Sequence, residues 1–163
     1  MRTSVLIIFF ITHASVSIAD TLTGRVVRVT DGDTIVVLDT NNAQHKIRLQ
    51  GIDAPERKQA FGTKSKEHLS DLIAGHVVIV EYNKRDRYDR ILGKVLLSNK
   101  DMNLEQVMAG LAWHYKKYQK EQSPEDREFY SEAEIEARKD KRGLWYDANP
   151  VPPWEYRKLK RKK

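Results

Sequence analysis

The chain has 163 residues, of which 40% are hydrophobic and 32% are charged. This length and composition fit one water-soluble domain with an ordinary core, and they exclude collagen-like and polytopic membrane proteins. The formal net charge of +6 favours an anionic partner, such as nucleic acid or an acidic surface, without choosing between them. Because the chain contains no cysteine, disulfides, zinc–thiolate sites and a cysteine nucleophile are excluded.

The amino-terminal segment predicts a secretory signal peptide over residues 1–19. Arg2 precedes an apolar run from Val5 to Ile11, and small residues then lead to a cleavage site near Ala19. The run is too short for a membrane span, which needs roughly 20 apolar residues. The alternative is an uncleaved anchor or an amino-terminal core strand. We therefore expect a secreted or periplasmic protein with no membrane attachment after cleavage.

The positive charge is concentrated at the carboxyl end. Six of the seven residues in 157–163 are lysine or arginine, whereas the rest of the chain after the signal peptide is close to neutral. The proline-rich stretch 149–153 cannot continue a helix. We expect residues 148–163 to form an extended, mobile basic tail that follows a domain over residues 20–147.

The first part of this domain has the pattern of short strands. Asp31-Gly32-Asp33 has a turn composition and separates two β-branched runs, which indicates a hairpin. In the next strand the polar and apolar residues alternate, so Arg48 is expected to point away from the core. A charged loop over residues 83–90 joins the last two strands. The predicted strands are 26–29, 34–38, 46–50, 76–81 and 91–97.

Three helices are predicted in the same domain. The first covers residues 63–74, the second begins at the N-cap candidate Asn103, and the third begins at Ser123-Pro124 and ends before Gly143. Five strands with three helices indicate an α+β protein. A small, partly open β-barrel that carries helices is the layout in which the OB-fold is common.

Acidic residues gather near the ends of two predicted strands. Asp31 and Asp33 lie in one turn, and the segment from Arg48 to Glu56 contains Asp53. Carboxylate oxygens are the hard ligands that Ca²⁺ prefers, although no segment has the spacing of an EF-hand loop. On composition alone, the pattern equally fits two turn-forming aspartates and a structural ion pair between Arg48 and Asp53.

A second charged segment, residues 86–90, contains two arginines on either side of an aromatic ring. Arg87 and Arg90 are suited to a bidentate phosphate contact, and Tyr88 is suited to stacking on a base. The alternative is a solvated charged loop. Tyr115 and Tyr118, which follow the second predicted helix, are further candidates for base stacking, with ordinary packing as their alternative.

Together, the two segments resemble the signatures of the staphylococcal nuclease (thermonuclease) family. The first signature is Asp-Gly-Asp-Thr followed at a fixed distance by an Arg and an Asp-x-Pro-Glu, and residues 31–34 and 48–56 match every specified position. The second matches at residues 86–88 and at Arg90. The resemblance spans residues 21–146 and implies an α+β fold, a five-stranded OB-fold β-barrel with three α-helices.

Position 89 departs from the second signature, where the family has Gly or Gln. Asp89 adds a negative charge beside the arginine that would meet phosphate. We expect it to pair with Arg90 or Arg87 and weaken the grip on substrate, unless its side chain points outward.

The resemblance also implies a metal site and its ligands. Asp33 and Asp53 would bind Ca²⁺ through their carboxylates. Ala54 stands where the family usually has Thr, and it would contribute its backbone carbonyl, so the change of side chain is expected to be tolerated.

By the same resemblance, three residues carry the chemistry. Glu56 matches the general base that activates water, and Arg48 and Arg90 match the two arginines that hold the reacting phosphate. A guanidinium offers paired N–H donors to phosphoryl oxygens in a geometry that lysine does not reproduce.

The sequence therefore predicts a monomeric, Ca²⁺-dependent nuclease that hydrolyses DNA and RNA without sequence specificity. The resemblance implies 3′-phosphate products. Two alternatives belong to other classes. A non-catalytic OB-fold nucleic-acid-binding module should have lost a metal ligand or an arginine, and this chain keeps all of them. A secreted cationic surface-binding protein would work through its carboxy-terminal basic cluster.

Overall fold

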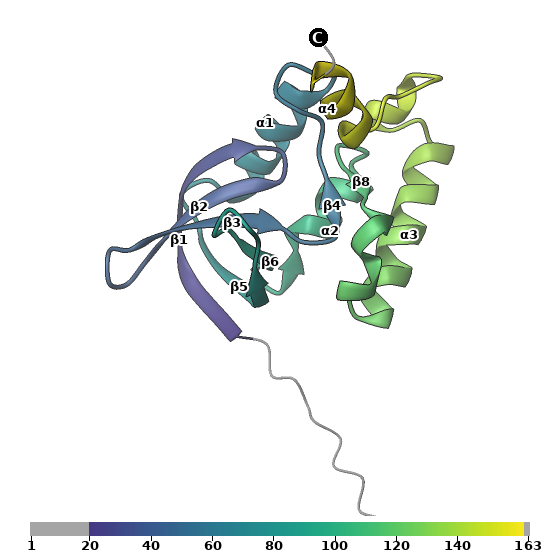
Figure 1. Ribbon diagram of the computed structural model, residues 1–163. Helices are drawn as coiled ribbons and strands as arrows, with labels where there is room; N and C mark the ends of the chain where they lie inside the picture. Colours follow the sequence, from purple (N-terminus) through teal and green to yellow (C-terminus); the bar gives the residue numbers. More distant parts are fainter. Residues whose placement is uncertain (1–19, 162–163) are drawn as a thin grey trace, which may run out of the picture.

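Strands β1 (Asp20–Asp31) and β2 (Thr34–Asp39) form the hairpin that the sequence predicts, with Asp33 in the turn between them (Figure 1). This computed structural model describes residues 20–161, and the predicted signal peptide at 1–19 lies outside the described residues. The other strands are β3 (Gln44–Leu49), β4 (Ile52–Asp53), β5 (Val77–Arg85), β6 (Ile91–Leu97), β7 (Lys100–Asp101) and β8 (Trp113–His114).

Five strands close into a barrel. The strand order is β3-β2-β1-β5-β6-β7, and a parallel pairing of β3 with β6 joins the two sides. Ile47 and Leu49 of β3 are buried in the barrel, whereas Arg48 between them is only partly buried on the other face, as the alternating pattern predicts. The short strand β4 pairs with β8 outside this sheet.

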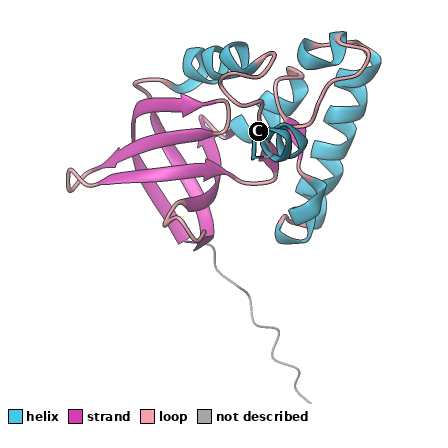
Figure 2. Ribbon diagram, turned by 45° about the horizontal axis from the view of Figure 1, so that its top comes forward, coloured by secondary structure: helices cyan, strands magenta, loops and turns pink. Residues whose placement is uncertain are grey.

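The helices lie outside the barrel, as Figure 2 shows. Helix α1 packs on β1, and α2 packs on β6 and on α3. The predicted five-stranded barrel with helices is therefore confirmed, and its architecture is that of an α+β OB-fold. The helices are α1 (Gly62–Ile73), α2 (Met102–Met108), α3 (Pro124–Lys139) and α4 (Pro153–Arg161), with 3-10 turns at Lys116–Glu121 and Gly143–Tyr146.

The start of α3 agrees with the sequence, and the start of α2 does not. The Ser123 hydroxyl accepts a hydrogen bond from the Asp126 backbone N–H at 3.0 Å, with Pro124 in the first turn. The N-cap of α2 is Asp101 rather than Asn103. The Asn103 side chain is fully buried and instead donates to the Gly93 carbonyl at 3.0 Å.

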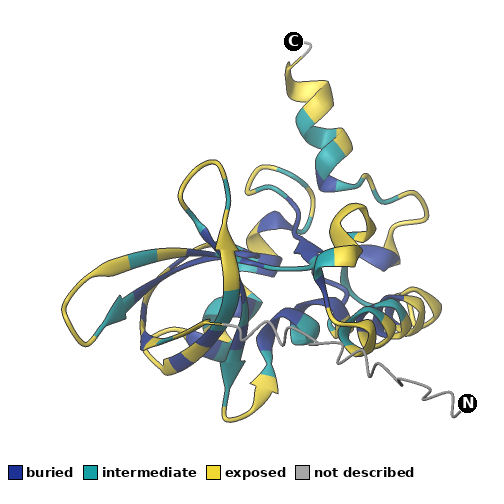
Figure 3. Cartoon of the chain, turned by 60° about the horizontal axis from the view of Figure 1, so that its bottom comes forward, coloured by how far each residue is buried: buried dark blue, intermediate teal, exposed yellow. Residues whose placement is uncertain are grey.

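The main core fills the barrel and the space under α1 and α2. Figure 3 shows the buried positions concentrated in the strands and in the faces of the helices that cover them. Ile35, Ile47 and Leu69 are fully buried within it. A smaller core joins Trp113 and Trp145. Among residues 20–161, no helix is both long and apolar enough to cross a membrane.

The carboxyl end was expected to be extended and mobile, and this expectation is wrong for residues 153–161. They form α4, which begins at the buried Pro153. Hydrogen bonds join α4 and the residues just before it to the loop before α1: the Gln59 side chain donates to the Val151 carbonyl at 2.6 Å, and the Tyr156 hydroxyl donates to the Lys58 carbonyl at 3.1 Å. The tail therefore folds back onto the domain.

Candidate active site

The end of the barrel brings three sequence-predicted residues into direct contact. Asp33 lies in the β1–β2 turn, Arg48 on β3 and Asp53 at the end of β4. The Arg48 guanidinium donates to Asp53 Oδ1 at 2.7 Å and forms a second ion pair with Asp33 Oδ2. Because Arg48 separates two carboxylates, it keeps their negative charges from facing each other without compensation.

The backbone explains why these residues meet. Thr34 pairs with Arg48 in the β2–β3 ladder, and the Leu49 N–H donates to the Asp33 carbonyl at 2.8 Å. The turn lies so close to α1 that a Cβ at Gly32 would clash with the Ser65 side chain, and only glycine fits there. The glycine of this turn is therefore required by packing, since its φ is not positive.

Both carboxylates of this cluster are buried. The Asp53 side chain has no exposed surface, and that of Asp33 is 7% exposed. Burial lowers the pKa of the Arg48 guanidinium, Asp53 and Asp31 raise it, and the positive charge of Arg90 lowers it again. The parallel β3–β6 pairing supplies the geometry: Ile91, the residue after Arg90, pairs with Ile47, the residue before Arg48, so the two arginines lie at adjacent strands and at the same end of the barrel.

The loop after β4 carries the next two predicted residues. The Ala54 backbone N–H donates to Asp33 Oδ2 at 2.7 Å, which ties the loop to the first turn. The Glu56 N–H donates to the Gln59 side chain at 3.1 Å, and the Glu56 carboxylate is 41% exposed. Glu56 is thus more accessible to bulk water than Asp33 or Asp53.

A divalent cation would meet only oxygen donors here. Asp33 and Asp53 place buried carboxylates here, and the Ala54 backbone N–H contacts Asp33. Among residues 20–161, no three His, Cys, Asp or Glu side chains gather into a metal-binding group. Oxygen donors fit Ca²⁺, and the remaining ligands would be water and substrate. The buried Asp53 carboxylate already contacts two guanidinium groups, so the site stabilises positive charge.

The β5–β6 turn presents the second charged segment. β5 extends to Arg85, so the turn is shorter than the loop expected at 83–90. Asp86 Oδ2 accepts from Arg90 Nε at 2.8 Å and lies 2.7 Å from Arg90 Nη2, which fixes the direction of that guanidinium. Arg87 and Arg90 lie 4.8 and 5.5 Å from the centroid of the Tyr88 ring, which is largely exposed.

Asp89 does not pair with Arg90 or Arg87 as expected. Its backbone is left-handed, with φ of 58°, and its carboxylate lies 3.2 Å from Arg85. The side chain is 85% exposed. The outward-pointing arrangement is therefore the one found, with the carboxylate beside Arg85 at the start of the turn.

The aromatic candidates after α2 have a partner that the sequence did not reveal. Tyr115 and Tyr118 contact each other edge to face, with ring centroids 5.2 Å apart. Trp154 of α4 stacks on Tyr115, also at 5.2 Å, with planes inclined by only 20°. Trp154 further contacts Trp113 edge to face at 5.5 Å. The first turn of α4 therefore extends the aromatic surface beside the site.

Arg157 is the site residue that sequence reasoning missed. Its guanidinium donates to Asp53 Oδ2 at 2.7 Å and to Glu56 Oε1 at 2.8 Å. Burial lowers its pKa, but the two carboxylates outweigh this effect, so the net pKa is raised. The available signal was that of a helix: Pro153 at its start, an acid in the first turn and bases in the last. The run of basic residues was interpreted as a disordered tail instead.

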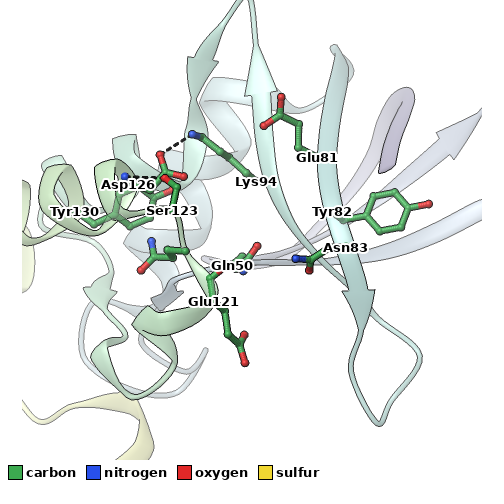
Figure 4. Close-up of a pocket in the computed structure, with 10 residues that line it drawn as sticks. Gln50, Glu81, Tyr82, Asn83, Lys94, Glu121, Ser123, Asp126 and Tyr130 are labelled. Atoms are coloured by element: carbon green, nitrogen blue, oxygen red, sulfur yellow. Dashed lines mark hydrogen bonds and ion pairs between the residues drawn. The ribbon is translucent and has the colours of Figure 1, made fainter. Parts of the chain in front are cut away.

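A separate pocket between β5, β6 and α3 contains none of the predicted site residues (Figure 4). Lys94 ion-pairs with Asp126 at 2.7 Å, and the Tyr130 hydroxyl donates to Asp101 at 2.7 Å. These groups satisfy one another, and they connect the barrel to α3. The residues of this pocket therefore hold the barrel and α3 together, and we do not assign a second active site to it.

Comparisons with known proteins identify related sequences. Residues 46–147 match the family model described as staphylococcal nuclease homologue. A protein of Escherichia coli named as an uncharacterized endonuclease is 46% identical over 162 residues, which cover 98% of this chain and 100% of that protein. A micrococcal nuclease of Shigella flexneri is 42% identical, with 83% of this chain and 80% of that protein covered. A Haemophilus influenzae protein, also named as an uncharacterized endonuclease, is 40% identical over 97% of this chain and 84% of its own length.

Proposed function

The chain belongs to the staphylococcal nuclease family, and from this premise we propose that the protein is a Ca²⁺-dependent nuclease that hydrolyses phosphodiester bonds in DNA and RNA without sequence specificity. One observation carries the proposal. Arg48 contacts the buried carboxylates of Asp33 and Asp53, and Arg90 immediately precedes the adjacent paired strand at the same end of the barrel. This arrangement combines a place for a cation with two guanidinium groups for one phosphate.

Asp33, Asp53 and the Ala54 carbonyl would hold Ca²⁺, which when bound supplies Lewis-acid neutralisation of a phosphoryl oxygen. The flexible oxygen donor set suits Ca²⁺ better than Mg²⁺, whose coordination is shorter and stricter. We expect Mg²⁺ to support little turnover.

The two arginines bind the reacting phosphate. Asp86 engages Nε and Nη2 of Arg90, so the other N–H groups of this guanidinium are directed by that contact and can donate to phosphoryl oxygens. Arg48 is held by two carboxylates and would donate its remaining N–H groups to the same phosphate. Positioned donors are worth roughly 3 to 4 kcal/mol each when charge grows on the phosphoryl oxygens.

Glu56 acts as the general base. Its partly exposed carboxylate takes a proton from water as the water oxygen bonds to phosphorus, and the bond from phosphorus to the 5′ oxygen breaks. The departing oxygen takes a proton from solvent. The products are a 3′-phosphate and a 5′-hydroxyl.

Base recognition would come from stacking rather than from hydrogen bonds. Tyr88, Tyr115 and Tyr118 offer ring faces, and Arg87 offers a further phosphate contact. A ring face accepts every base, and phosphate contacts do not distinguish ribose from deoxyribose. We therefore propose activity on both DNA and RNA, by a monomer that acts in the periplasm or outside the cell.

Digestion assays with the chain from residue 20 onward test this proposal. Single-stranded DNA, duplex DNA and RNA are incubated with Ca²⁺, Mg²⁺ or a chelator, and the ends of the products are identified. Digestion with Ca²⁺ alone and 3′-phosphate ends are expected. Glu56→Gln should reduce kcat by about 10²- to 10⁴-fold, whereas the exposed Glu128→Gln on α3 should not. The absence of digestion under every condition would end the nuclease proposal.

A further inference from the structure

A groove lies between α4 and the segment that contains β8 and the first 3-10 turn. Twelve residues line this α4 groove, and seven of them are lysine or arginine against a single acid, Glu134. Three of the others are aromatic. Its α4 side is formed by Trp154, Arg157, Lys158 and Arg161. These four residues lie beyond the part of the chain that matches the family model, which ends at residue 147.

The one acid of the groove is already occupied. Glu134, whose side chain is 3% exposed, lies 3.0 Å from Lys116 and 3.5 Å from Arg138. Arg157 is neutralised by Asp53 and Glu56. The groove therefore keeps an excess of positive charge, to which the exposed Lys158 and Arg161 contribute. These two residues are three apart on α4, so they project from the same face of the helix.

The aromatic residues of the groove contact one another, and Tyr115 and Trp154 are partly exposed whereas Trp113 is buried. The Trp154 ring stacks on Tyr115 and contacts Trp113 edge to face. Flat rings next to uncompensated cations match a ligand that alternates planar bases with phosphates, which is single-stranded nucleic acid. Duplex nucleic acid conceals its base faces, and an anionic membrane surface has no rings to stack.

The groove is continuous with the candidate active site. Arg157 lines it and also contacts Asp53 and Glu56, the proposed metal ligand and base. Arg87 and Tyr115 also line it, and both are candidate substrate contacts. A strand whose reacting phosphate meets Arg48 and Arg90 would enter this groove with its neighbouring nucleotides.

We propose that the α4 groove is a subsite for single-stranded nucleic acid, in which Lys158 and Arg161 contact phosphates and Trp154 with Tyr115 provides the stacking surface. This inference rests on the proposed function for the position of the cleaved bond. It adds contacts to nucleotides beside that bond. The gain in affinity should therefore depend on the length of the strand.

Equilibrium binding in the presence of a chelator measures the subsite without cleavage. Fluorescein-labelled oligothymidylates of about 3 and about 12 nucleotides are titrated with the chain from residue 20 onward, at several salt concentrations. The variants are Lys158→Gln/Arg161→Gln and a control, Lys46→Gln/Lys100→Gln, which removes two exposed lysines of the barrel. Thermal unfolding followed by circular dichroism verifies that each variant is folded.

The unmodified chain should bind the longer strand more tightly than the shorter one. The α4 variant should bind the longer strand about tenfold more weakly at low salt. The slope of the logarithm of its binding constant against the logarithm of the salt concentration should become shallower by about 0.7 for each lost phosphate contact. The control should match the unmodified chain. The charge-preserving Lys158→Arg/Arg161→Lys should restore most of the affinity, because phosphate contact requires charge rather than one side-chain shape.

Equal affinities and salt slopes in the α4 variant and the control would overturn the subsite. Preferential loss of binding to duplex DNA, or to vesicles of anionic lipid, would assign the groove to that ligand and also overturn it. The two proposals fail separately. A chain that binds strands through α4 but digests nothing contradicts the nuclease, whereas normal digestion with no effect of the α4 variant contradicts only the subsite.

Discussion

Two regions of the molecule place an arginine on the same buried carboxylate. Arg48 reaches Asp53 from β3, five residues earlier in the chain, and Arg157 reaches it from α4, 104 residues later. The Arg48 side chain is 15% exposed and that of Arg157 is 37% exposed. The first contact belongs to the closed barrel, and the second to a short helix docked on its end.

The difference lies in what holds each arginine. Strand pairing on both sides of β3 fixes the backbone of Arg48, so its side chain stays beside the carboxylates as long as the barrel is closed. A nine-residue helix is marginal by itself, so α4 depends on its contacts with the domain. We infer that Arg48 is a permanent part of the site, whereas Arg157 can be displaced, and each prediction below tests that contrast.

The largest effect is expected from Arg48→Lys. Lysine keeps the positive charge but loses the paired donors that reach two carboxylates and a phosphate. We expect kcat to fall by about 10²- to 10³-fold, measured on single-stranded DNA with saturating Ca²⁺. Arg25→Lys, at an exposed position on β1, is the control and should change nothing. Unaltered kcat in Arg48→Lys would show that its role is purely structural.

Arg157→Gln should strengthen Ca²⁺ binding. The guanidinium competes with any other cation for Asp53 and for Glu56, so removing its charge makes the carboxylates more available. We expect Ca²⁺ to bind about tenfold more tightly, measured by titration calorimetry without substrate. Arg28→Gln on β1 is the matched control. Equal or weaker Ca²⁺ binding in Arg157→Gln would refute the displacement of Arg157.

Acidification should lower the stability of the fold through His114. His114 lies on β8, which pairs with β4, and burial lowers its pKa below the ordinary value of 6.5, while Gln122 and Glu134 raise it and Lys116 lowers it. The Tyr130 ring packs edge-on against it.

Because the unfolded chain takes up the proton first, the contribution of neutral His114 to stability is complete above about pH 6.5 and declines below it. Urea unfolding from pH 8 to 5 should show a falling midpoint below that value, and His114→Gln should make this fall shallower. Parallel pH profiles for the two chains would contradict the assignment to His114.

The smallest effect is expected at the β5–β6 turn. Asp89 is exposed and pairs with Arg85, away from Arg90, so Asp89→Gly should leave KM and kcat unchanged at low salt. Glycine also fits the left-handed backbone at this position. We expect the thermal midpoint to stay level or rise slightly. A changed KM would show that the negative charge of the Asp89 carboxylate acts on the substrate from a distance.

The local sequence determined the arrangement of Asp33, Arg48 and Asp53 at the end of the barrel. The turn composition at Asp33, the alternation around Arg48 and the spacing to Asp53 are properties of neighbouring residues, and strand pairing makes their meeting a direct consequence of the hairpin order. The same holds for the cap at Ser123, where one hydroxyl and one proline decide where α3 begins. Such features are predictable because the interacting groups are close in sequence.

Only the tertiary structure decided the rest. The composition around Asn103 is that of a cap, yet its amide is buried against the Gly93 carbonyl, and Asp101 caps α2 in its place. The basic tail has few apolar residues, so its sequence does not predict a folded segment. In the folded protein, however, Trp154 stacks on Tyr115 and Arg157 donates to Asp53. These contacts join residues far apart in the chain, so their free energy has no local signature in the sequence.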